Sequence, residues 1–266
     1  MKTRIYLLLV VLINVLLIQG CEEESGWAPG TGGSVKMVVE ACITSEFKTQ
    51  QVKLSTTTLS PNDIPDGVSS AQVIVSTRDS VYLFKEDSAR PGIYLSEKKF
   101  SGKAGEEYSL FISKGDTIIT AKATMPPVTD FRFLTYSPSG DNGNYKITWV
   151  AETYSNWEPA MYEIIIGQPD DSQAKLYYYT LPSLDIHQVF PPRMEQTEFK
   201  KGTVITERKY SLSPEHADYI RALLSETGFS GGFYTTMPAN VPTNLSNGAL
   251  GFFNASEVIQ KTSVVE

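Results

Sequence analysis

The chain has 266 residues, with 23 lysines and arginines against 30 aspartates and glutamates, and a formal net charge of −7. This acidic balance argues against a nucleic-acid partner, because such a partner requires a basic surface. With only two cysteines, the chain lacks the cysteine density of a disulfide-stapled domain.

The first 20 residues have the pattern of an export signal. Lys2 and Arg4 precede an apolar run over residues 6–18, which is shorter than the roughly 20 residues of a membrane-spanning helix. The run ends in "IQGC" at Cys21, which resembles a bacterial lipobox. We expect a lipid on Cys21, and an ordinary signal peptide with a chance cysteine is the alternative. Cleavage before Cys21 would change the net charge from −7 to −9, because two basic residues are lost.

Three acidic residues, Glu22, Glu23 and Glu24, follow the cysteine directly. They resemble the surface-export signal of Bacteroidota lipoproteins, and a solvated charge run is the alternative. Residues 21–34 then form an acidic and Gly/Ser/Pro-rich segment that we interpret as a flexible tether. With Cys21 lipidated, Cys42 has no disulfide partner, and its alternating apolar surroundings predict a small buried hydrophobe.

Residues 35–126 predict an immunoglobulin-like β-sandwich. Seven short segments rich in β-branched and aromatic residues alternate in polarity and are separated by turn signals such as Pro91-Gly92 and Gly115-Asp116. Met125-Pro126-Pro127 ends the run and marks the predicted domain boundary, since proline cannot donate to a strand ladder.

Residues 127–266 predict a second β-sandwich with one helix and a long C-terminal loop, so the predicted fold class is all-β. A strand with Trp149, a loop, and a strand starting near Tyr162 resemble the start of a fibronectin type III module. Ser213 suits a helix N-cap and Pro214 the first helical position, which predicts a helix over residues 214–226. The segment "ALGFFNA" near the C-terminus predicts a returning strand.

The order of several segments resembles a known family. "VVEACIT", "GIYLSEKKFSGKAGEEYSLFI" and the closing "TNLSNGALGFFNAS" are similar to the domain of unknown function 4249 family. The resemblance extends over residues 36–260. It implies a Bacteroidota outer-membrane lipoprotein, often found beside TonB-dependent transporters. The family has no recognised catalytic residues, so the resemblance implies none here.

No local motif supports catalysis or metal binding. Gly228-Phe229-Ser230-Gly231-Gly232 fits G-x-S-x-G, but the nucleophile elbow needs a strand before the serine and a histidine after it. Here a predicted helix precedes the serine, and both histidines, His187 and His216, come before it. His216 is expected to be solvated at the helix start. We predict no catalytic residue, no metal and no cofactor.

Three hydroxyl residues and two aromatic residues are the remaining candidate sites. Ser80, Ser88 and Thr117 each follow an aspartate at an expected turn and resemble Bacteroidota O-glycosylation sites, although such pairs are also common in turns. Phe233 and Tyr234 lie in a Gly/Pro-rich segment and are candidate partner-docking anchors. The alternative is that they fill the core.

Three functions remain open from the sequence. The first is a non-enzymatic accessory lipoprotein on the cell surface, attached to the outer membrane by its lipid and docked on a barrel protein such as a TonB-dependent transporter. The second is a stand-alone surface lipoprotein that binds a glycan or a nutrient. The third is a hydrolase, which no local motif supports.

Overall fold

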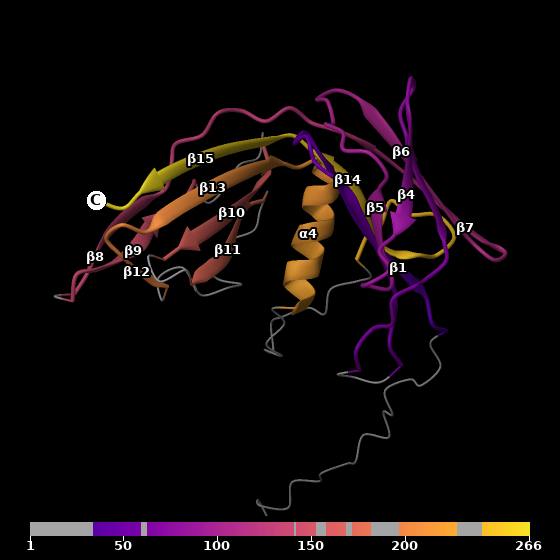
Figure 1. The fold of residues 1–266 in the computed structure, drawn as a ribbon, viewed down its shortest axis with the longest axis horizontal. Coiled ribbons are helices and arrows are strands. Elements are labelled where there is room, and N and C mark those ends of the chain that lie inside the picture. Colours follow the sequence, from indigo (N-terminus) through magenta and orange to yellow (C-terminus); the bar gives the residue numbers. More distant parts are fainter. Residues whose placement is uncertain are drawn as a thin grey trace, which may run out of the picture. The chain divides into compact units, whose positions relative to one another are not determined.

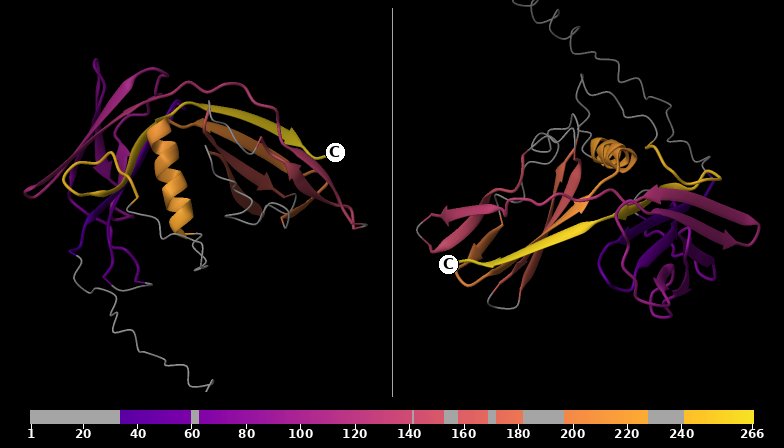
Figure 2. Two further views of the ribbon diagram at one scale, coloured as in Figure 1. Left: turned by 180° about the vertical axis from the view of Figure 1, so that it is seen from behind. Right: turned by 90° about the horizontal axis from the view of Figure 1, so that it is seen from above.

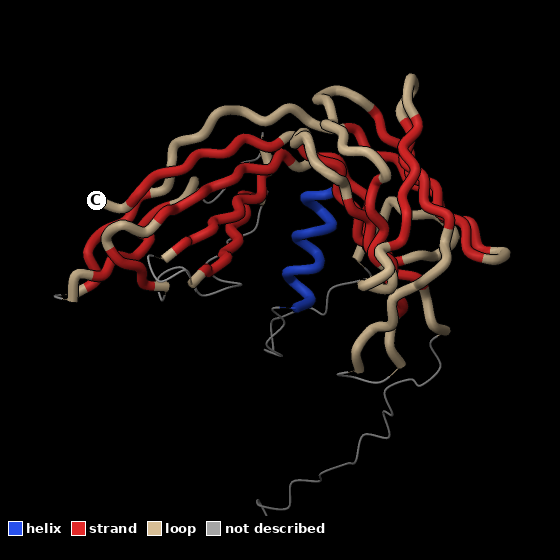
Figure 3. Tube along the Cα trace, in the orientation of Figure 1, coloured by secondary structure: helices blue, strands red, loops and turns tan. Residues whose placement is uncertain are grey.

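The computed structural model describes residues 34–59, 63–140, 142–152, 158–168, 172–181, 197–227 and 241–266. Val35–Glu266 form one compact unit. Within the described residues the protein is built from strands with a single helix, which confirms the predicted all-β class (Figure 1, Figure 3).

The first sheet contains all seven strands that the alternating segments predict. In the described chain it has eight strands in the order β14-β1-β2-β5-β4-β3-β6-β7. Their bounds are β1 (Met37–Thr44), β2 (Gln51–Thr56), β3 (Gln72–Ser76), β4 (Val81–Glu86), β5 (Ile93–Ser96), β6 (Glu107–Lys114), β7 (Thr117–Thr124) and β14 (Leu250–Ser256).

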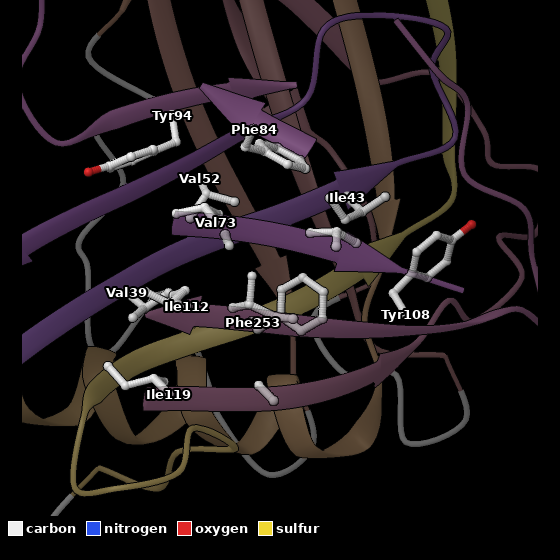
Figure 4. Packing of buried hydrophobic residues seen from close by; sticks show 14 of the residues in the cluster. Val39, Ile43, Val52, Val73, Phe84, Tyr94, Tyr108, Ile112, Ile119 and Phe253 are labelled. Carbon is white, nitrogen blue, oxygen red and sulfur yellow. The ribbon is translucent and has the colours of Figure 1, made fainter. Parts of the chain in front are cut away.

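One face of this sheet surrounds a single apolar core. Alternate residues of each strand point inward, as the period of two requires. Figure 4 shows side chains from distant strands meeting there, among them Val39, Val73, Tyr108, Ile112 and Phe253. All five are at most 1% exposed.

Strand β14 corrects the sequence-based domain division. The second sandwich was expected to hold everything from residue 127 to 266, but β14 pairs in parallel with β1, from Val38↔Leu250 to Thr44↔Ser256. The physical reason is that Phe253 and Ala255 bury their side chains in the first core. Gly251 has φ +93°, and a Cβ there would lie 2.1 Å from the Val39 carbonyl oxygen, so only glycine fits this close pairing.

Two further sheets face each other around a second core. One has the order β11-β10-β13-β15 and the other the order β12-β9-β8. Their strands are β8 (Thr135–Ser139), β9 (Asn144–Trp149), β10 (Ala160–Gly167), β11 (Gln173–Thr180), β12 (Glu198–Lys200), β13 (Val204–Ser211) and β15 (Val258–Val264). Ile164, Ile166, Phe199 and Ile205 are fully buried between them. Strands β12 and β15 were not predicted from the sequence.

The helix α4 (Pro214–Thr227) begins where its cap predicts. The Ser213 hydroxyl accepts a hydrogen bond from the His216 backbone N–H at 3.2 Å, which satisfies a free N–H of the first turn. Ala217 and Ile220 pack against Leu181 and Leu212 beside the second sheet system. The helix therefore buries one side against its neighbours, and Figure 2 shows it between the sheets.

Candidate functional site

An apolar strip crosses the outer face of the first sheet. The inward positions of β3, β4 and β6 are taken by the buried Val73, Phe84 and Leu110, so their sequence neighbours point outward. The strand register places Leu83 opposite Ile74, and Ile74 opposite Phe111. Three large side chains on three strands therefore form one continuous row.

Two exposed aliphatic residues extend this row toward opposite ends of the strands. Val81 on β4 is 67% exposed and Ile118 on β7 is 50% exposed, while Leu83 in the row is 49% exposed. We call Ile74, Val81, Leu83, Phe111 and Ile118 the outer apolar face. Scattered exposed aliphatic residues are normal, but neighbours in register on adjacent strands are typical of interaction surfaces.

The surroundings of the outer apolar face are small and polar. Ser76 and Ser109 lie opposite each other on β3 and β6, and Thr120 lies opposite Phe111 on β7. Two lysines on the same side of the sheet are held in exposed ion pairs, Lys122–Glu107 at 2.7 Å and Lys85–Glu97 at 2.9 Å. A polar rim around an apolar centre is the anatomy of a protein–protein interface.

The three candidate glycosylation residues are all exposed. Ser80 lies in the turn between β3 and β4, Ser88 in the turn between β4 and β5, and Thr117 just after the β6–β7 turn. Ser80 and Thr117 flank Val81 and Ile118 in sequence, at opposite ends of the outer apolar face. Glycosylation of these three hydroxyls stays a prediction. Their exposure would give a modifying enzyme access to them.

Several predicted site residues lie outside the described residues. These are Cys21, Glu22, Glu23, Glu24, His187, Phe233, Tyr234 and the G-x-S-x-G segment at 228–232. The roles predicted for them are untested by the geometry.

His216 is not solvated as expected from the sequence. Its ring stacks on Phe252 of β14 at 5.0 Å between centroids and lies 6.1 Å from the Tyr219 ring. Its Nδ1 atom is buried and has no hydrogen-bond partner in the described structure. Burial lowers the pKa of His216 to about 4, so the ring is neutral at neutral pH and serves as an aromatic contact between α4 and β14.

Cys42 is half-buried and lies outside the first core, so it is less buried than the sequence predicted. It lies on β1, and burial raises the pKa of its thiol, which keeps the sulfur protonated. A protonated, partly buried thiol is a poor nucleophile.

A charge network that no sequence motif indicates joins the β1–β2 connection to the second sheet system. The Arg208 guanidinium pairs with Glu46 through Nη2 and with Glu163 through Nη1, the latter at 2.6 Å. Lys175 Nζ and the Tyr210 hydroxyl also contact Glu163, at 2.9 Å and 3.1 Å. Burial alone would raise the pKa of Glu163, but Lys175 and Arg208 together lower it.

This network is a structural brace. Glu163 stays ionised and accepts from four side-chain donors, Lys175, Arg208, Tyr210 and, at 3.4 Å, Tyr177, so it has little capacity left to accept a proton from a substrate. Breaking a buried pair of this kind leaves a charge without compensation, which is strongly destabilising.

Glu207 is the most perturbed carboxyl group near the second core. It is fully buried on β13; its Oε2 accepts the Leu134 N–H at 2.8 Å, and its Oε1 has no partner in the described residues. Burial raises the pKa of Glu207 to about 7. Its neighbours are core residues such as Ile205 and Ile164, so we assign it a structural position.

The described residues contain no group of three or more His, Cys, Asp or Glu side chains placed to hold a metal ion. No helix in the same residues is long and apolar enough to cross a membrane.

Residues 31–262 match the family described as Domain of unknown function (DUF4249). The chain belongs to the DUF4249 family. No curated protein matches it.

The segments that carry the DUF4249 resemblance are fold-determining in this structure. In the closing segment, Asn244 Nδ2 donates to the Lys122 carbonyl on β7 at 2.9 Å and to the Phe253 carbonyl on β14 at 2.7 Å. Asn244 Oδ1 accepts the Phe253 N–H at 3.1 Å. One amide therefore clamps the two edge strands of the first sheet together.

Other residues of the closing segment strengthen the clamp formed by Asn244. The Ser246 N–H donates to the Thr120 carbonyl, and the Ser246 hydroxyl accepts the Thr120 N–H at 2.8 Å. Leu245 and Ala249 are buried in the first core. The closing segment thus covers the edge of β7, which would otherwise expose unpaired backbone groups.

Proposed function

We propose that the mature protein is a lipid-anchored lipoprotein on the outer surface of the outer membrane, where it is a non-enzymatic docking subunit of a membrane machine. A TonB-dependent transporter is the partner we favour. The observation that supports the docking role is the outer apolar face, with Val81, Leu83 and Ile118 each about half exposed or more in a sheet whose edge strands are held together.

The tether fits this role. Residues 21–34 span at most about 3.3–3.6 Å each when extended, so the folded unit stays within roughly 50 Å of a lipid on Cys21. Attachment to the membrane raises the effective concentration of the docking face toward any partner in the same membrane. A weak interface would then suffice for a stable complex.

The anchor is tested by replacing its nucleophile. Cys21→Ser should leave an unprocessed precursor that takes up no fatty-acid label, because the thioether cannot form. The parent should label and migrate as the shorter mature chain. Equal labelling of the two chains would contradict the anchor.

The surface location is tested separately with the acidic triplet. Replacing Glu22, Glu23 and Glu24 by alanine should leave fatty-acid labelling unchanged but protect the chain from protease added to intact cells. Lys53→Gln, which breaks only an exposed ion pair with Glu40, is the matched surface variant and should remain digestible. If the triplet variant and the parent were digested equally, the three glutamates would not be an export signal but only a solvated charge run.

A further inference from the structure

A cleft of about 240 Å³ opens between the second sheet system and the segments at residues 129–132 and 149–152. It is distinct from the outer apolar face, and no motif in the sequence points to it. Ligand sites for drug-sized molecules have volumes of roughly 300–1,000 Å³, so this cleft suits something smaller, about the size of one ring.

The floor of the cleft contains the Tyr162 hydroxyl. Tyr162 lies on β10 and is 5% exposed, and its hydroxyl makes no hydrogen bond to the described residues, although its ring packs at the edge of Phe131. Burial raises the pKa of Tyr162 to about 12, so the group is a neutral donor and acceptor. The hydroxyl oxygen is not sealed from solvent, so it can bond to water or to a ligand in the cleft.

An ammonium group lies beside this hydroxyl. The strand register places Lys209 of β13 opposite Tyr162. Lys209 Nζ donates to the Thr129 hydroxyl at 2.9 Å and to the Thr129 carbonyl at 3.2 Å, which uses two of its three protons. The Glu158 carboxylate is 3.9 Å away, beyond hydrogen-bond distance. The third proton is therefore available to a ligand.

The wall supplies an aromatic surface and a second donor. The Arg132 guanidinium lies 5.3 Å from the centroid of the Trp149 ring, and both line the cleft. Arg132 makes no hydrogen bond to the described residues, so all its N–H groups can donate.

The rim of the cleft is acidic. Asp130, Glu152 and Glu158 line it and are exposed. Two basic groups, Lys209 and Arg132, also line the cleft. Lys261, which is not part of the lining, pairs with Asp130 at 2.7 Å, so three cations balance the three carboxylates.

This arrangement discriminates between ligand classes by charge. An anion would meet carboxylates at the rim, and a cation would meet an ammonium and a guanidinium at the wall and floor. A neutral ring with many hydroxyls meets neither penalty, because its oxygens can accept from Lys209 and Tyr162 while its hydroxyls donate to the rim. Its C–H face can pack on an aromatic ring.

We propose that this cleft binds a single neutral sugar ring, either free or at the end of a glycan. The proposal does not depend on the membrane anchor or on the outer apolar face. It adds a ligand site to a protein whose docking surface lies on the other sheet system.

Saturation-transfer NMR on the full lipidated protein, held in an amine-oxide detergent that contains no sugar, tests the proposal. The probes are the methyl glycosides of glucose, galactose, mannose and N-acetylglucosamine at millimolar concentration, with acetate and methylammonium as charged probes. We expect transfer to at least one glycoside and none to acetate or methylammonium. Transfer to a charged probe alone, or to no probe, would overturn the proposal.

Tyr162→Phe removes only the unpartnered hydroxyl and keeps the ring that packs in the core. It should fold like the parent and weaken the binding of the glycoside about 3- to 10-fold, the range for one lost neutral hydrogen bond. Tyr177→Phe, on an exposed ring outside the cleft, is the matched control and should leave the affinity unchanged. Equal affinities for parent and Tyr162→Phe would show that any bound sugar lies elsewhere.

Discussion

At the residue scale, two buried titratable side chains give the fold opposite responses to pH. Glu207 has a raised pKa, so the folded state holds a proton that the unfolded state releases between pH 4.5 and about 7. His216 has a lowered pKa, so the unfolded state takes up a proton first as the pH falls from 6.5 toward about 4. Ionisation of Glu207 therefore lowers the free energy of unfolding as the pH rises. Protonation of His216 lowers it as the pH falls.

Glu207→Gln isolates the first effect. The parent should lose free energy of unfolding relative to the variant as the pH rises from 4.5 to 8, by about 3 kcal/mol at 1.36 kcal/mol per pKa unit. Urea unfolding of both proteins across this range gives the difference, in which the His216 contribution cancels. A difference that stays flat with pH would show that Glu207 ionises normally in the folded state.

Neither effect could be predicted from the sequence. Glu207 lies in "VITERKYS", where the alternation around Ile205 and Thr206 does not show that the second facing sheet covers this carboxyl. His216 sits in the first turn of a helix, a position that is usually solvated, and only the packing of α4 on Phe252 buries it. Burial of a polar residue depends on long-range contacts that local pattern does not contain.

At the element scale, the local sequence pattern identified most of the strands but not the strands with which they pair. Alternation and turn residues predicted β1 to β7 in order, and Ser213-Pro214 predicted the start of α4. The pairing of β14 with β1 joins segments some 200 residues apart, and nothing in "ALGFFNA" distinguishes one sheet from the other. The strand β12 has only three residues, too few to show an alternating pattern, and a single residue, Glu257, separates β15 from β14.

The Asn244 clamp makes the closure of the first sheet testable. Asn244→Ala removes three hydrogen bonds and leaves the Phe253 N–H and carbonyl without these partners, which should cost about 2–4 kcal/mol in the free energy of unfolding. Thermal unfolding should show a lower Tm for this variant.

Asn247→Gly is the control for that clamp. Asn247 has φ 57°, which glycine adopts freely, and its side chain makes one long hydrogen bond of 3.4 Å to the Ile118 carbonyl. Its stability should stay within about 0.5 kcal/mol of the parent. If Asn244→Ala were as stable as Asn247→Gly, the closing segment would not hold the sheet edges together.

At the scale of the whole molecule, residues 35–266 act as one unit because several contacts cross between the two cores. Strand β14 ends in the first sheet at Ser256 and β15 begins in the second at Val258. The Arg208 pairs with Glu46 and Glu163 add a second connection. A braced unit of this kind presents the outer apolar face in a fixed orientation, which lowers the entropic cost of docking.

The central claim is that the outer apolar face contacts a partner in the outer membrane. The most direct measurement is photo-crosslinking in intact cells, with benzoylphenylalanine placed at Leu83 or at Tyr177. Both side chains are 49% exposed, but Tyr177 lies on β11, away from the outer apolar face, so it is a matched control. We predict one discrete crosslinked species from position 83, containing an outer-membrane barrel protein, and none from position 177. No crosslink from position 83, or the same products from both positions, would contradict the account.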